Sequence, residues 1–286
     1  MELILPEELV AALAHRRRRL HLYTWHRLRH SWLRLGDRER RGVEEIDPSW
    51  VPPRAALDPR GHPIHDNDSG VDFLHMNRRL MEWVNRTLAA AGGDTARVAG
   101  WRRTPPPGDP DYPVPAFSDS GLERLKSDGY YERHLTAWER RFTDADYLRR
   151  VSLGRLGSEI EFTICNDMHL RWAAPSPVGY RPSTAFAKNI DPRWDDPAYN
   201  YLGDLYASHV NPLFWKLRGW VDDRVEDWKL ARGVVGDIEW EGAWAGPECG
   251  DDGEAAVEAM ERIDRVISGS AAGTADGYLR PDPTRL

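Results

Sequence analysis

The feature that most constrains the fold is the spacing of large apolar residues, which recurs every three or four positions over much of the chain. In residues 22–35 this spacing is formed by Leu22, Trp25, Leu28, Trp32 and Leu35. Such a period places side chains on one face of an α-helix. Alternation at every second position, which indicates a half-buried strand, is scarce. The sequence therefore predicts an all-α fold.

The same pattern divides the chain into helices and long irregular segments. Proline- and glycine-rich composition predicts loops over residues 47–68, 99–118 and 174–198. Residues 1–245 are expected to form one helical domain, and residues 246–286 a link, a helix and a loose tail. Helices are expected over residues 9–35, 71–91, 120–129, 130–142, 144–152, 156–173 (capped by Ser158), 254–267 and two stretches within 200–229.

Composition excludes several classes of protein. The net charge of −7 gives no basic field for nucleic acid, and the basic run at residues 15–20 is expected to be a solvated helix face. No apolar stretch approaches the roughly 20 residues of a membrane span. The first residues carry their charges after the apolar run, the reverse of a secretory signal. With only Cys165 and Cys249, a cytoplasmic protein with free thiols is expected, and a homodimer remains open.

Aromatic and thiol–imidazole features indicate a pocket. The count of 13 Trp is high and favours a core or pocket of flat rings that could stack on an aromatic substrate. In "ICNDMHLRW", Cys165 and His169 are four residues apart, so they share one helix face. That spacing is typical of a metal pair or of a catalytic dyad.

Three segments together resemble the type-3 copper proteins, the family of tyrosinases, catechol oxidases and haemocyanins. "FTICNDMHLRW" resembles the His-Asn-x-x-His of the second copper segment, and "DFLHMNRRLMEW" the Phe-Leu-Pro-Trp-His-Arg-Arg of the first. "NPLFWKLRGWVDDRVEDW" resembles Asp-Pro-x-Phe-x-x-His-His-x-x-x-Asp-Arg. Pro212, Phe214 and Asp222 fall in register there, and Arg224 comes one residue late. The resemblance implies a tyrosinase-like four-helix bundle core with long irregular loops.

The resemblance also implies where six histidines would hold two coppers, and most of those positions differ here. Asn77, Cys165 and Arg218 stand at three of them, while His169 is retained. A fourth position holds Asp68, unless a gap shifts it to His65 or His62, and the first ligand would be His26 or His30. Arginine has no lone pair to offer a metal. We therefore expect no dicopper centre and no bound metal.

The remodelled pocket is expected to keep chemistry of its own. Glu161 and Asn166 match the family's pair that orients water near copper. His169 is a candidate acid/base oriented by Asp68 or Glu161, with Arg218 holding an anionic group. Cys165 is a candidate nucleophile activated by His169. The expected catalytic set is His169, Glu161, Asn166, Cys165 and Asp68, and the expected substrate-binding set is Arg218, Asn77, His209, His26 and His65.

These residues predict an enzyme without a cofactor. We expect a metal-independent acid/base enzyme of secondary metabolism that catalyses cyclisation, condensation, isomerisation or hydrolysis of a small aromatic or phenol-derived metabolite. One alternative is a copper-dependent phenol or aminophenol oxidoreductase with an altered or mononuclear site. It would use His169, Cys165 and histidines of the N-terminal helices. The other alternative is a non-catalytic binding or accessory protein.

Overall fold

The computed structural model describes residues 5–116, 120–247 and 253–270. Over these ranges the chain is built from helices and irregular segments, with an isolated β-bridge between Leu57 and Pro63 and no strand. The prediction of an all-α fold is confirmed. Across the same ranges, every helix is too short or too polar to cross a membrane.

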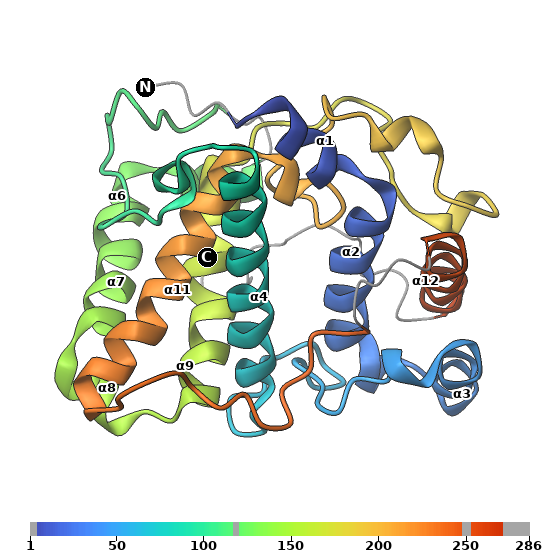
Figure 1. Ribbon diagram of the computed structural model, residues 1–286, viewed down its shortest axis with the longest axis horizontal. Coiled ribbons are helices and arrows are strands. Elements are labelled where there is room, and N and C mark those ends of the chain that lie inside the picture. The colour runs from blue at the N-terminus through green and yellow to red at the C-terminus, as the bar shows by residue number, and fades with distance from the viewer. Residues whose placement is uncertain (1–4, 117–119, 248–252, 271–286) are drawn as a thin grey trace.

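Four helical segments run roughly parallel through the centre of the molecule (Figure 1). They are α2 (Arg16–Ser31), α4 (Ser69–Ala90), the run from α9 (Leu153–Ile160) to α10 (Asn166–Trp172), and α11 (Pro212–Arg232). Helix α4 packs against both α9 and α11. Their facing sides are apolar and buried, as the spacing of the large residues predicts.

Other helical elements surround these segments. They are α1 (Glu7–Ala14), η1 (Trp32–Arg34), α3 (Asp37–Ile46), η2 (Pro48–Trp50), η3 (Thr95–Val98), α5 (Ser120–Lys126), α6 (Asp128–Tyr130), η4 (Tyr131–Leu135), α7 (Thr136–Thr143), α8 (Ala145–Arg150), η6 (Thr184–Phe186), η7 (Pro192–Asp195), η8 (Ser208–Val210) and α12 (Gly253–Ser268). The described parts of the segments predicted to be loops are irregular apart from the short turns η2, η6 and η7.

The helix that carries the Cys–His motif is longer than predicted and is wound more loosely in its middle. Its first turn is capped by Ser152, whose Oγ accepts from the Arg155 amide at 3.2 Å, so the predicted start at residue 156 is three residues late. Ser158 lies inside the helix and donates its hydroxyl to the Ile64 carbonyl at 3.0 Å. Between α9 and α10, η5 (Glu161–Cys165) is a π-helix. Such segments recur at functional sites.

Glycines let α4 and α9 cross with their backbones in contact. A Cβ atom on Gly157 would lie 2.1 Å from the carbonyl oxygen of Gly70, and one on Gly70 would lie 2.0 Å from that of Gly154. No side chain fits in this space. The crossing therefore fixes where η5 stands relative to α4.

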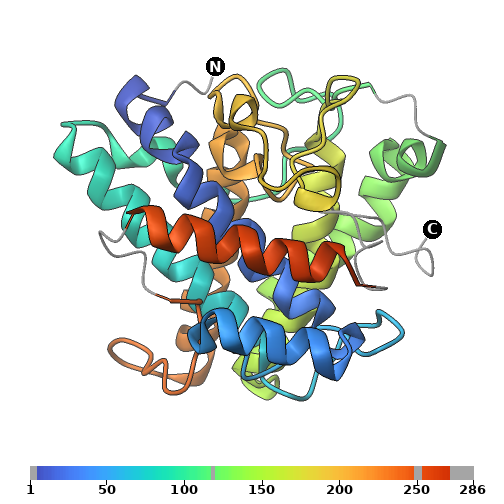
Figure 2. The same ribbon diagram turned by 90° about the vertical axis from the view of Figure 1, so that its right-hand side faces the viewer.

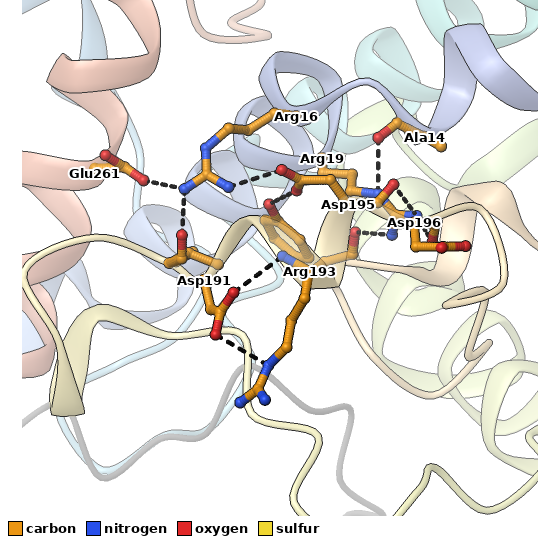
Figure 3. A network of polar contacts seen from close by, with 10 residues as sticks. Ala14, Arg16, Arg19, Asp191, Arg193, Asp195, Asp196 and Glu261 are labelled. Carbon is orange, nitrogen blue, oxygen red and sulfur yellow. Dashed lines mark hydrogen bonds and ion pairs between the residues drawn. The ribbon is translucent and has the colours of Figure 1, made fainter.

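The basic run at residues 15–20 is not a solvated face. The predicted helix over residues 9–35 breaks at His15 (φ −56°, ψ 127°), which separates α1 from α2. Arg19 is fully buried, and its guanidinium donates to the carbonyls of Ala14 at 2.9 Å and Asp196 at 3.0 Å (Figure 3). The expectation of solvation is wrong because irregular backbone around η7 supplies carbonyl oxygens that only a buried cation reaches.

The same run ties helix α12 to the rest of the molecule. Arg16 bonds to Asp195 at 2.8 Å and to Glu261 of α12 (Figure 3). Arg27 and Asp264 form a buried ion pair between α2 and α12. In Figure 2, α12 lies across α2, and both α2 and α3 pack against it. Helix α12 thus shares the core of residues 1–245, whereas Cys249 and the predicted tail from residue 271 onward lie outside the described residues.

Candidate functional site

A small buried pocket lies among α2, α4, η5, α10 and α11. It offers about 40 Å³, enough for about three water molecules. The structure brings to its wall six of the residues expected from the sequence, together with side chains that the sequence analysis did not select. The wall consists of His26, His30, Phe73, Glu161, Phe162, Cys165, Asn166, His169, Leu205, Ser208 and Arg218.

His169 lines this pocket, and one of its ring nitrogens has no hydrogen-bond partner among the described residues. Its Nδ1 lies 3.0 Å from the carbonyl oxygen of Leu202, which can only accept, so Nδ1 carries the proton. Its Nε2 is buried and has no hydrogen-bond partner. Burial, and next the charge of Arg218, lower the pKa of His169 to about 3. The ring is therefore a neutral acceptor held in one tautomer.

The protonation of His169 makes stability depend on pH. As the pH falls below 6.5, His169 takes up a proton in the unfolded chain, whereas in the folded protein it does so only near pH 3. Between these two pH values its contribution to the free energy of unfolding therefore becomes steadily less favourable as the pH falls. The wild-type free energy of unfolding is expected to fall about 1.4 kcal/mol per pH unit more steeply than that of His169→Gln. Urea unfolding between pH 4.5 and 7 measures the difference. The control is His15→Gln, at an exposed site. If the free energy of unfolding of His169→Gln fell with decreasing pH as steeply as that of this control, the assignment would be contradicted.

Glu161 is held as a carboxylate by Arg29. The guanidinium bonds both carboxylate oxygens, at 2.6 and 3.0 Å, and His30 Nε2 lies 3.4 Å from Oε1. Burial alone would raise the pKa of Glu161, but Arg29 and His30 outweigh it and hold the pKa at about 2. Sequence reasoning missed Arg29. The sequence does contain a signal for it: Arg29 lies four positions after Trp25, so a charged residue falls on the apolar face of the helix.

Arg218 is the second cation of the pocket, and it is differently placed. It is 5% exposed, and its guanidinium carbon lies 4.7 Å from the ring centroid of Phe214 and 5.5 Å from that of Phe73. Its Nε is buried without a partner, and its side chain forms no hydrogen bond or ion pair with the residues that the structure describes.

Cys165 also lines the pocket, but its electrostatics do not favour attack on a substrate. The side chain is 3% exposed, and burial raises the pKa of its thiol to about 11 despite the nearby charge of Arg218. Because the thiolate is the nucleophilic form, the folded site at neutral pH holds the unreactive thiol. The hypothesis of a Cys165 nucleophile gains no support from this arrangement.

Four expected site residues lie away from the pocket wall. Asp68 is exposed at the start of α4 in the left-handed region (φ 59°), and it packs close to Gly154. The side chains of the other three make contacts elsewhere: His65 Nδ1 with Ser158 Oγ at 3.0 Å, Asn77 Nδ2 with the Arg218 carbonyl at 3.0 Å, and His209 Nε2 with the Leu13 carbonyl at 3.0 Å. Asn77 thus supports the backbone that carries Arg218.

The donor groups of the pocket do not fit a pair of coppers. Its wall carries the imidazoles of His26, His30 and His169, with the Arg218 guanidinium among them. A single ion is a different case. Over the described part of the chain, one ligand atom each from His26, His30 and Glu161 lie within 4.8 Å of one another. Arg29 occupies both oxygens of that carboxylate, so binding a metal there would require Glu161 to share them.

Comparison with known proteins gives no independent assignment. The chain matches no protein-family model and no curated protein.

Proposed function

We propose that this chain is a copper-independent acid/base enzyme that acts on a small aromatic or phenol-derived metabolite. The observation that carries the proposal is the Nε2 of His169, which has no partner among the described residues and belongs to a side chain that lines the pocket, while its Nδ1–H donates to the Leu202 carbonyl. A ring fixed in this way accepts a proton at one atom and returns it from the same atom. Arg218 holds the negative charge that develops on the substrate.

The arrangement of the helices supports the resemblance from which the proposal started. In the type-3 copper fold a four-helix bundle surrounds the site, and here α2, α4, the α9–α10 run and α11 surround the pocket. Facing helices converge side chains on such a core site. The two guanidinium groups, Arg29 on Glu161 and Arg218 unpaired, favour an anionic substrate over a second divalent cation.

The test uses the purified full-length chain with a panel of hydroxyphenyl and aminophenyl compounds, and products are followed by mass spectrometry. Conversion is expected to persist under a metal chelator and without oxygen. His169→Gln is expected to lower the rate by about 100-fold or more, the range for loss of a positioned acid/base. Two equivalents of bound copper with oxygen consumption, or an unchanged rate in His169→Gln, would overturn the proposal.

A second candidate function, a metal-dependent oxidoreductase with a mononuclear site, is favoured by the convergence of His26, His30 and Glu161. Two imidazoles and one carboxylate form a ligand set that suits iron(II) as well as copper. Titration with each metal separates the candidates. This alternative requires that the chain bind one equivalent of metal and that His26→Gln no longer bind it. It also requires that the chelator abolish activity.

A further inference from the structure

The Arg218 guanidinium is a buried positive charge for which the described residues supply no counter-ion. Among the described residues that line the pocket, Glu161 is the only one with a carboxylate, and Arg29 already binds both of its oxygens. Burying a cation without a counter-ion is costly. An anion that entered this pocket would gain more from Arg218 than from an exposed cation.

The charge of Arg218 acts on the pocket itself. Burial, then His30 and then Arg218 lower the pKa of His26, and burial followed by Arg218 lowers that of His169. For Cys165, Arg218 opposes the rise in pKa that burial causes. These three side chains belong to two different helical segments, and all line the pocket. Arg218 is therefore close enough to these groups for its charge to act on them, as it also does on His209 away from the pocket wall.

Three polar atoms of pocket-lining residues have no hydrogen-bond partner among the described residues: Arg218 Nε, His169 Nε2 and His26 Nδ1. The first two are of opposite kinds. Arg218 offers donors and a positive charge, whereas His169 Nε2 offers a lone pair and needs a donor. Phe73, Phe162 and Leu205 supply apolar wall between and around them. A ligand that satisfies both groups carries an anion, a hydroxyl and a flat apolar body.

We propose that the pocket binds a small aromatic carboxylate with a ring hydroxyl, whose carboxylate pairs with Arg218 and whose hydroxyl donates to Nε2 of His169. This inference rests on the proposed function and names its substrate class. The planar fork of arginine matches a carboxylate in a bidentate manner. The cavity of about 40 Å³ holds a carboxylate group, and the ring extends toward the half-buried His30, Phe162 and Asn166.

Binding of such an anion also prepares His169 for catalysis. In the empty pocket Arg218 disfavours a proton on His169. A carboxylate bound to Arg218 cancels that charge, so the imidazole becomes a better proton acceptor when substrate is present. A neutral phenol of the same shape would leave the cation unopposed and the ring a poor base.

The experiment compares the ortho, meta and para isomers of hydroxybenzoate with the neutral hydroxybenzyl alcohol of the same substitution. Quenching of tryptophan fluorescence gives the dissociation constants. At least one isomer of the acid is expected to have a dissociation constant about tenfold lower, or lower still, than that of the corresponding alcohol. Arg218→Met is expected to remove this preference. His169→Gln is expected to weaken the hydroxybenzoate but not benzoate, which lacks the hydroxyl.

A measurement without ligand guards against a misfolded variant. Arg218 forms no hydrogen bond or ion pair with the described residues, so Arg218→Met leaves no polar group without its partner and is expected to melt at or above the wild-type temperature. Arg29→Met leaves the Glu161 carboxylate buried without its partner and is expected to melt well below it. Equal affinity of every acid and its alcohol, or a marked fall in the Tm of Arg218→Met, would overturn the inference.

The outcomes also separate this inference from the proposed function. Acid-selective binding through Arg218, with turnover unaffected in His169→Gln, would keep the substrate class and remove the acid/base role. Turnover that depends on His169 with no preference for acids would do the reverse.

Discussion

Gly157→Ala is expected to lower the free energy of unfolding by about 3 kcal/mol or more, at the upper end of the cost of overpacking. The new Cβ would lie 2.1 Å from the Gly70 carbonyl oxygen and 2.6 Å from its carbon. Both partners are backbone, so no side chain can rotate away, and α4 must separate from α9. Urea unfolding measures the loss.

The matched control is Gly253→Ala at the start of α12, where an added Cβ meets nothing within 4 Å. Alanine favours a helix over glycine, so this variant is expected to be unchanged or to gain up to about 1 kcal/mol. If Gly157→Ala were as stable as this control, the close backbone crossing of α4 and α9 would be refuted.

Arg29→Met is expected to cost about 3–5 kcal/mol, because it leaves the Glu161 carboxylate buried without its partner. Most of this loss should return in the double variant Arg29→Met/Glu161→Leu, in which neither charge remains. A double-mutant cycle of unfolding free energies measures the coupling between the two side chains.

The pH dependence of the free energy of unfolding is a second test of the ion pair between Arg29 and Glu161. Glu161 has a pKa of about 2 in the fold against 4.5 as its ordinary value, so its stabilisation is present above pH 4.5 and is lost as pH falls toward 2. This acid-sensitive contribution should be absent from Arg29→Met, in which Glu161 takes up its proton at higher pH. Additive losses in the cycle would show that the two side chains act independently.

Helices were predicted well where apolar spacing and neighbouring residues along the chain determine their ends. The expected helix at residues 71–91 differs by two residues or fewer from α4 (Ser69–Ala90), because apolar spacing marks its face and two glycines follow it. The cap of the motif helix was misplaced, because Ser158 is satisfied by the distant Ile64 carbonyl, a contact that no local pattern encodes. The break at His15 was also missed.

The site was predictable only in part, for a related reason. Resemblance pointed to residues such as His169, Glu161 and Arg218, which line the pocket. The partners that define their chemistry come from far along the chain: Leu202 for His169, and Arg29 for Glu161. Spacing along one helix gives the direction of a side chain but not what faces it across the bundle.

The π-helical turn at Glu161–Cys165 sets the direction in which the His169 side chain leaves α10. An α-helix rotates by about 100° per residue, and a π turn accommodates one residue more than an α turn. If the same residues were wound as a regular α-helix, all of α10 would be rotated relative to α9 by about that angle. The imidazole would then point away from the Leu202 carbonyl while the α4–α9 crossing stayed intact. The wider turn therefore decides which side chains of α10 face the cavity, and it does so without changing the packing of α9 against α4.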